Sequence, residues 1–193
     1  MKKRIILILI VLVVVYSLFS VLTVLSARRA IATTQKAVGA AKLQDLDATK
    51  AYLRDARNQF RSTKKLLIVF TPVRIVPLIG WYVADIQRGV DGAIYGLEGA
   101  STFAEAITPY ADVLGLEGQG TFLGGTAQER LAKAIETLSK VTPQIDEVGE
   151  SLKKGRSQID QIQSWRYPDI LPGKPGSKIK TAKKCSDVVV YIT

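Results

Sequence analysis

Ile5–Ser26 reads IILILIVLVVVYSLFSVLTVLS, a run of twenty-two residues without a charged residue, a proline or a glycine. At about 1.5 Å per helical residue the run spans roughly 33 Å, enough to cross a hydrocarbon core of about 30 Å. A secretory signal sequence has a shorter apolar core, of about 7–15 residues. We therefore expect Ile5–Ser26 to be a transmembrane helix. Two alternatives stay open: a long signal peptide, because Val24 and Ser26 would suit a cleavage site, and a buried core helix.

The charges that flank this run indicate its orientation. Five basic residues and no acidic residue lie in residues 1–29: Lys2, Lys3 and Arg4 before the run, Arg28 and Arg29 after it. The cytoplasmic side of a span carries the excess of positive charge. Residues 1–4 are therefore expected to be a basic stub in the cytoplasm. The sequence predicts a single-pass protein of the cytoplasmic membrane, with its N-terminus inside and its C-terminal body outside.

The charge of the body argues against a nucleic-acid partner. The formal net charge is +10, but residues 30–170 carry seventeen basic and sixteen acidic groups. The excess lies in residues 1–29 and in residues 171–193, which hold five lysines and one aspartate. Proteins that bind single strands combine basic and aromatic side chains along a groove, and the body lacks that pattern. We expect no nucleic acid among the partners.

Residue types that carry catalysis or bind metals are scarce. The chain has no histidine and a single cysteine, Cys185, which removes the commonest general base and the usual imidazole ligands. Carboxylate pairs remain, such as Asp85 with Asp91 or Asp146 with Glu150. Asp146 and Glu150 share a helix face, but on its polar side, which favours solvated charges. The sequence predicts a protein that is not an enzyme and uses no cofactor or metal.

The body, residues 27–165, is predicted to form an antiparallel hairpin or bundle of long helices. Residues 27–43 are rich in Ala, Gln, Lys and Arg, so the membrane helix is expected to continue into solvent. Asp45 or Asp47 is a candidate N-cap of a second helix. A third helix is expected at about Tyr82–Leu114. The fold class is therefore all-α.

The fourth helix, expected over Thr126–Trp165, has the clearest apolar stripe. Its members recur at three- and four-residue steps with one seven-residue gap, which resembles coiled-coil packing. They are Leu131, Ile135, Leu138, Val141, Ile145, Val148, Leu152, Ile159 and Ile162. Because the stripe keeps its phase across Pro143, we expect one kinked helix, although a new helix could also start there. The stripe is a candidate contact surface.

Leu66–Val83 connects the second and third helices and reads LLIVFTPVRIVPLIGWYV. A second crossing is disfavoured, because two prolines interrupt a helix and the central Arg74 is costly in lipid. Two interpretations stay open. The segment is either a buried connection between helices, or an interfacial loop that returns to the bilayer and places Trp81 and Tyr82 at the level of the headgroups.

Four glycines follow one side of the third helix: Gly89, Gly92, Gly96 and Gly99. Inside a helix each costs about 0.5–1 kcal/mol relative to alanine, so a row of four indicates close packing. The spacing of Gly92 and Gly96 lets two helix backbones approach closely. The ridge is either ordinary packing within the bundle or a seam for self-association.

Two segments lack helical periodicity. Gly115–Gly125 holds five glycines and is expected to be a flexible loop between the third and fourth helices. Residues 166–193 begin with Pro, Gly and Lys and end in the β-prone run VVVYIT. We expect them to form a short, irregular, linker-like basic tail.

The stretch from Ala48 to Leu114 resembles a known family. Its pieces are ATKAYLRDARNQF, VPLIGWYVADIQRGVDGA and ITPYADVLGL, with Val76-Pro77-Leu78-Ile79-Gly80 as the most specific motif. Over about residues 5–165 the chain is similar to the N-terminal region of the bacterial envelope family called domain of unknown function 4012. The resemblance implies a membrane-anchored envelope protein with long helices. Such proteins typically continue into a larger C-terminal domain, and no catalytic residue is implied.

These patterns favour a membrane-anchored helical module of the cell envelope. We expect it to act as a structural or assembly protein through protein–protein contacts, with the bilayer as one partner and a protein partner or a second copy as another. The alternative is a ligand-sensing helical ectodomain. Only residues 1–4 would face the cytoplasm, so a sensor would have to signal through a partner.

Overall fold

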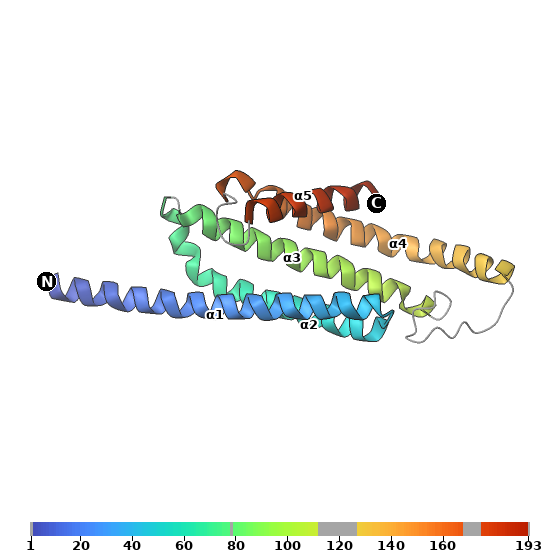
Figure 1. Ribbon diagram of the computed structural model, residues 1–193, viewed down its shortest axis with the longest axis horizontal. Helices are drawn as coiled ribbons and strands as arrows, with labels where there is room; N and C mark the ends of the chain where they lie inside the picture. The colour runs from blue at the N-terminus through green and yellow to red at the C-terminus, as the bar shows by residue number, and fades with distance from the viewer. Residues whose placement is uncertain (1, 78, 112–126, 168–174, 193) are drawn as a thin grey trace.

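The computed structural model describes residues 2–77, 79–111, 127–167 and 175–192. Within these residues the chain is all-α, as the sequence predicts, and contains no strand (Figure 1). The α-helices are α1 (Lys2–Lys42), α2 (Leu46–Leu67), α3 (Ile79–Ile107), α4 (Ala127–Asp160) and α5 (Pro175–Ile192). Three short 3-10 segments join them: η1 (Ile68–Ile75), η2 (Thr108–Tyr110) and η3 (Ser164–Arg166).

A tight turn reverses the chain between α1 and α2. Gln44 adopts a left-handed backbone with φ of 60°, and Asp45 is the N-cap of α2. The carboxylate of Asp45 accepts a hydrogen bond of 2.9 Å from the backbone N–H of Ala48, which satisfies one of the free donors at the helix start. The expected continuation of the first helix into the body and the N-cap at Asp45 are both confirmed.

Small side chains hold α1 and α2 close together. Ala30 and Ala56 are fully buried and Ala37 is 1% exposed. Without bulky groups between the two helices, the hydroxyls of Ser26 and Thr63 meet at 2.7 Å. Close approach of this kind increases van der Waals contact along the whole seam. The two helices therefore form a closely packed hairpin, and the first part of α1 projects beyond the other helices (Figure 1).

The remaining helices pack in chain order, with α3 against α2, α4 against α3 and α5 against α4. The core between α2 and α3 contains Leu53, Phe60, Val90, Ile94 and Leu97. Ion pairs at its edge join Lys64 to Asp91 at 2.7 Å and Arg57 to Glu98 at 3.9 Å. Helices α1 and α3 both pack against α2. Two cavities lie between α1 and α3, at different positions along α2.

Helix α4 runs without interruption through Pro143, which confirms one continuous helix and not two. A proline removes one hydrogen bond of the ladder, and packing against α3 compensates for that loss over the second half of α4. There Val148, Ser151 and Gly155 are buried. The predicted loop Gly115–Gly125 lies outside the described residues.

The prediction of an irregular C-terminal tail is wrong for Pro175–Ile192, which form α5. Proline suits the first helical position, where its missing N–H costs nothing, and the lysines and alanine that follow are good helix formers. Packing on α4 adds to this, since the Nζ atom of Lys183 donates to the carbonyl oxygen of Asp160 at 2.9 Å. The composition of this segment did not predict a helix, because the helix depends on packing against α4.

The connection between α2 and α3 is not buried, which corrects one of the two interpretations of Leu66–Val83. Helix α2 ends at Leu67, η1 contains Pro72, and no residue of η1 is buried. Ile68 is 62% exposed and Ile75 is 87% exposed. An apolar segment that the described helices leave exposed fits the interfacial interpretation.

Candidate membrane-facing site

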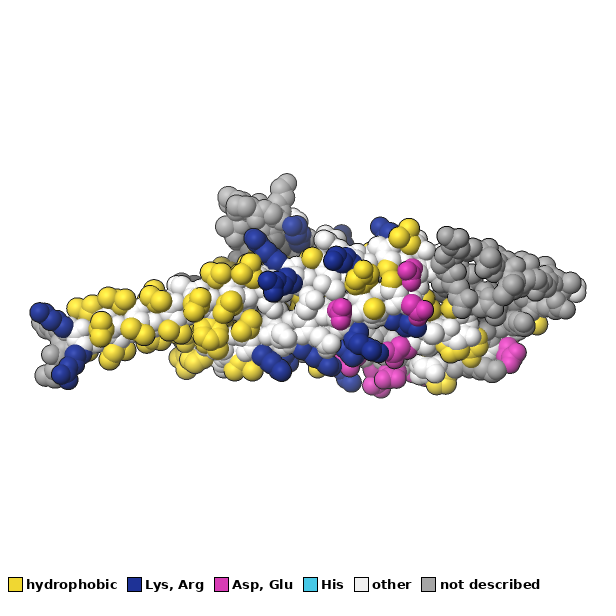
Figure 2. Space-filling model, turned by 90° about the horizontal axis from the view of Figure 1, so that it is seen from below, with side chains coloured by type: hydrophobic (Ala, Val, Ile, Leu, Met, Phe, Trp, Pro, Cys, Tyr) yellow, Lys and Arg dark blue, Asp and Glu magenta, His cyan; other side chains and the backbone are white. Residues whose placement is uncertain are grey.

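The first half of α1 presents an apolar surface that the described part of the chain leaves uncovered. The described Ile, Leu and Val side chains between Ile5 and Val15 are 40–65% exposed. In Figure 2 hydrophobic side chains cover this narrow end, with basic side chains at its tip and again where the molecule widens. Among the described residues, α1 is the one helix long and apolar enough to cross a membrane.

Segment η1 lies beside this apolar helix. The rings of Tyr16 and Phe70 contact each other, with their centroids 5.7 Å apart. Tyr16 precedes Ser26 by ten residues, which is about 15 Å of helix. The ring of Phe70 therefore lies beside the middle of Ile5–Ser26, while Arg74 of η1 is exposed. We call the apolar residues Ile68, Val69, Phe70, Val73 and Ile75 of η1, together with Val76 and Ile79, the apolar collar.

Gly80 allows the chain to turn from the collar into α3. A Cβ atom added at Gly80 would collide with the carbonyl oxygen of Arg74 and would lie 2.7 Å from its carbonyl carbon. No side chain fits there unless the backbone moves. This close approach is the physical reason why a glycine is needed at position 80 of this chain.

The two predicted interfacial aromatics lie at the start of α3, next to the collar. Trp81 is 49% exposed and Tyr82 is 42% exposed. The guanidinium of Arg166 stacks over the Trp81 ring at 5.0 Å, which is cation–π geometry. Tyr82 packs edge-on against Tyr167, with ring centroids 5.3 Å apart. The hydroxyl of Tyr82 also donates to the carbonyl oxygen of Arg166 at 3.3 Å. Both aromatics are thus about half exposed and each has a polar contact, a combination typical of residues at a membrane interface.

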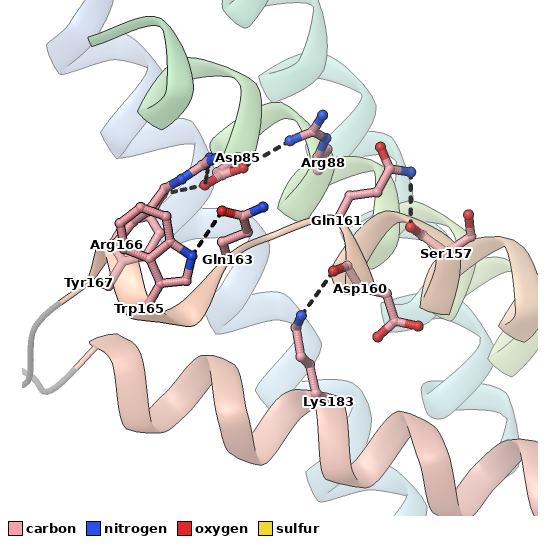
Figure 3. Close-up of polar contacts among 10 residues, drawn as sticks. All are labelled: Asp85, Arg88, Ser157, Asp160, Gln161, Gln163, Trp165, Arg166, Tyr167 and Lys183. Atoms are coloured by element: carbon pink, nitrogen blue, oxygen red, sulfur yellow. Dashed lines mark hydrogen bonds and ion pairs between the residues drawn. The ribbon is translucent and has the colours of Figure 1, made fainter. Parts of the chain in front are cut away.

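A buried carboxylate fastens the chain after α4 to the start of α3 (Figure 3). The side chain of Asp85 is only 2% exposed. It accepts a hydrogen bond from Arg88 Nη1 at 3.0 Å and one from Tyr167 Oη at 3.2 Å, and it lies 3.5 Å from Arg166 Nη1. Two cations and a phenol stabilise a charge that would be very unfavourable alone at this depth. We call these four residues the Asp85 clasp.

The clasp was not predicted from the sequence, which marked Asp85 only as a possible partner of Asp91. The structure instead pairs Asp91 with Lys64. It joins Asp85 to Arg166 and Tyr167, which follow it in the sequence by 81 and 82 positions. No local pattern links positions that far apart. Helix α3 also carries Arg88, Asp91, Glu98 and Glu105, so nothing in the sequence singled out Asp85 as the buried acid.

Burial raises the pKa of Tyr167 to about 12 from its ordinary 10.0, and the nearby charge and hydrogen bond of Asp85 add to the shift. The stabilisation by the neutral phenol is thus complete below about pH 10 and is lost as the pH rises through 12. We expect the difference in unfolding free energy between wild type and Tyr167→Phe to be constant up to pH 10 and then to shrink. A difference that stays constant through pH 12 would contradict this.

The glycine ridge lies under α4 within the same chain. A Cβ atom on Gly92 would come within 3.0 Å of Ile159 Cγ1 and 3.3 Å of the carbonyl oxygen of Gly155. One on Gly99 would lie 3.5 Å from Ser151 Cβ, and one on Gly89 would lie 3.9 Å from Ile162. Gly96 has no such neighbour within 4 Å. Packing inside the bundle therefore accounts for the close approach at Gly92 and Gly99.

The predicted stripe of α4 divides into two parts. Val148 and Ile162 are buried, and Ile145, Leu152 and Ile159 are partly buried. Ile135 is instead 62% exposed. The side chains of Leu131, Leu138 and Val141 lie outside the described residues. The C-terminal part of the stripe packs on α3, so it belongs to the core of this chain.

Within the described part of the chain, no group of three or more His, Cys, Asp or Glu side chains could hold a metal ion. Asp85, Arg88, Arg166 and Tyr167 pair with one another at this end of the molecule, and Ile68, Ile75 and Ile79 are exposed.

No model of a known protein family, no curated protein and no solved structure matches the chain. The resemblance to domain of unknown function 4012 therefore stays a prediction.

Proposed function

We propose that this chain is a single-pass, membrane-anchored helical module of the cell envelope that acts as a structural or assembly protein through protein–protein contacts. Ile5–Ser26 crosses the cytoplasmic membrane with the N-terminus inside, and the helices of the body project outside. The observation that carries the proposal is the continuous apolar surface formed by the first half of α1 and the collar beside it.

The basic residues support the assignment of this surface to a bilayer. Lys3 and Arg4 lie at one end of the apolar stretch, and Arg28 and Arg29 lie exposed at the other. Lysine and arginine at the ends of a span can extend their charged groups to the headgroups while their methylene chains stay in the apolar zone. Tryptophan and tyrosine at the start of α3 add the amphipathic rings typical of the interface.

An apolar groove that the described residues leave open supports a role in protein–protein contact. Beyond the predicted span, a cavity of about 300 Å³ lies between α1 and α3, and residues of α2 form its floor. Its lining includes Val38, which is 51% exposed, and Phe103, which is 46% exposed. Such a groove can receive an amphipathic helix of a partner. We call it the distal groove.

Site-specific photo-crosslinking in cells tests this function. A benzophenone amino acid at Val38 or at Phe103 is expected to give protein adducts of discrete mass, which mass spectrometry can assign to a partner or to a second copy. Asp55 and Arg61 are matched controls, because both lie exposed on α2 and neither lines the groove. Equal adduct yields at groove and control positions, or none at the groove, would contradict a docking role.

A further inference from the structure

A second cavity lies at the membrane end of the space between α1 and α3. It measures about 500 Å³ and is lined by residues of four consecutive elements. Helix α1 contributes Tyr16, Thr23 and Ala27, η1 contributes Phe70, and α3 contributes Val83 and Val90. The end of α2 forms its floor through Thr63 and Leu67. The volume is within the range of small-molecule sites, roughly 300–1,000 Å³.

The side chains that line this cavity are mostly apolar, and few of their polar groups are free to bind a ligand. The hydroxyls of Ser20 and Thr23 each donate to a carbonyl oxygen one turn earlier in α1, both at 2.8 Å. Thr63 likewise donates to the carbonyl oxygen of Gln59 at 2.9 Å. Hydroxyls that are already bonded to the backbone leave little to recognise a polar ligand. The occupant that fits is an apolar chain.

The position of the cavity indicates where that chain comes from. Tyr16, Ser20 and Thr23 belong to the predicted span itself, and Phe70 and Ile79 belong to the collar. The cavity is therefore continuous with the surface assigned above to the bilayer. Acyl chains of lipids would be the molecules at highest local concentration beside it. Each buried CH₂ group contributes roughly 0.8 kcal/mol, so a partly inserted chain would be held appreciably.

We propose that this cavity binds one acyl chain of a membrane phospholipid between α1, η1 and α3. The proposal rests on the proposed function, because the cavity meets lipid only if Ile5–Ser26 spans the bilayer. The bound chain fills the space that the bundle leaves between α1 and α3, and the lipid becomes part of the packing at the membrane end. The other possible occupant, a transmembrane helix of a second protein, is separated from lipid by the test below.

The test uses the full chain reconstituted in vesicles of phosphatidylethanolamine and phosphatidylglycerol that contain a phospholipid with a diazirine on one acyl chain. After irradiation, peptide mass spectrometry locates the labelled residues. We expect lipid adducts on Val83 and Val90. Val90 is only 7% exposed, so a label there has to come through the cavity. Val13, which is 65% exposed on the span, should be labelled by bulk lipid in any case.

Two variants that introduce the same side chain distinguish cavity binding from general contact with lipid. Ala27→Phe fills the cavity from α1 and is expected to reduce labelling of Val83 and Val90 several-fold, with Val13 unchanged. Ala32→Phe introduces the same ring at an exposed position of α1 outside the cavity and should change neither. Val24→Trp, at a lining residue that is 50% exposed, provides a second filling variant in case Ala27→Phe does not fold.

The outcomes separate this proposal from the function on which it rests. Labelled Val13 with unlabelled Val83 and Val90 would overturn the acyl-chain site and leave the membrane anchor intact. Labelling of Val90 that Ala27→Phe and Val24→Trp leave unchanged would overturn it as well. A protein helix in the cavity would exclude lipid from it and would likewise leave Val83 and Val90 unlabelled while Val13 is labelled. Absence of label at Val13 itself would overturn the anchor.

Discussion

Asp85→Asn is expected to lower the free energy of unfolding by about 2–4 kcal/mol, because it leaves two guanidinium groups without their shared anion. The Asp85 carboxylate is almost fully buried, whereas Arg88 is 30% exposed and Arg166 is 17% exposed. Water can therefore partly solvate the two guanidinium groups in the variant, which limits the loss of stability. Denaturant titration of the full chain in detergent micelles, followed by circular dichroism, measures the change.

Asp91→Asn is the matched control for this prediction. Asp91 lies on the same helix and pairs with Lys64 at 2.7 Å, but the lysine side chain is 55% exposed. An ion pair in contact with water contributes about 0–1 kcal/mol, so this variant should lose much less stability. Equal losses from Asp85→Asn and Asp91→Asn would show that the clasp does not hold the start of α3 to residues 166 and 167.

Gly92→Leu is expected to destabilise the bundle by about 3 kcal/mol, because the new side chain must displace α4 from α3. Even a single added carbon would meet Ile159 at 3.0 Å and the backbone of Gly155 at 3.3 Å. The backbone oxygen cannot rotate out of the way as the end of a side chain can. The same denaturant titration measures the loss.

Gly96→Ala is the control one helical turn away. Among the described residues, no atom of another helix lies within 4 Å of a Cβ atom at Gly96, so alanine adds helix propensity without a clash. We expect this variant to gain about 0.5–1 kcal/mol. Stabilisation by both Gly92→Ala and Gly96→Ala would mean that α3 and α4 do not pack closely at Gly92. A large loss from Gly96→Ala would indicate a contact of this face that the isolated chain does not have.

Local patterns were sufficient to predict a large part of this fold. The length of the apolar run and the composition after it predicted a first helix that continues into the body, and α1 extends to Lys42. The acidic residues after the turn predicted the N-cap, which is Asp45. The apolar stripe continues with the same periodicity across Pro143, which predicted one continuous helix there, and α4 is continuous at Pro143. Each of these depends on residues within a few turns of one another.

Features that depend on distant residues could not be predicted in the same way. The sequence left open whether the glycine ridge packs inside the chain, because that depends on which helix lies above it. Residues 175–192 have the composition of a linker, and α5 forms there because it packs on α4. The Asp85 clasp joins two segments about eighty residues apart. Tertiary packing decided all three.

The central claim is that Ile5–Ser26 stays in the bilayer and holds the helical body at the membrane. Extraction of membranes with alkaline sodium carbonate tests this most directly, using the uncleaved full chain and a control in which Val13 and Val14 are both replaced by arginine. The account predicts that the wild-type chain sediments with the membranes and that the arginine variant is released. Uncleaved wild-type chain in the supernatant would contradict it.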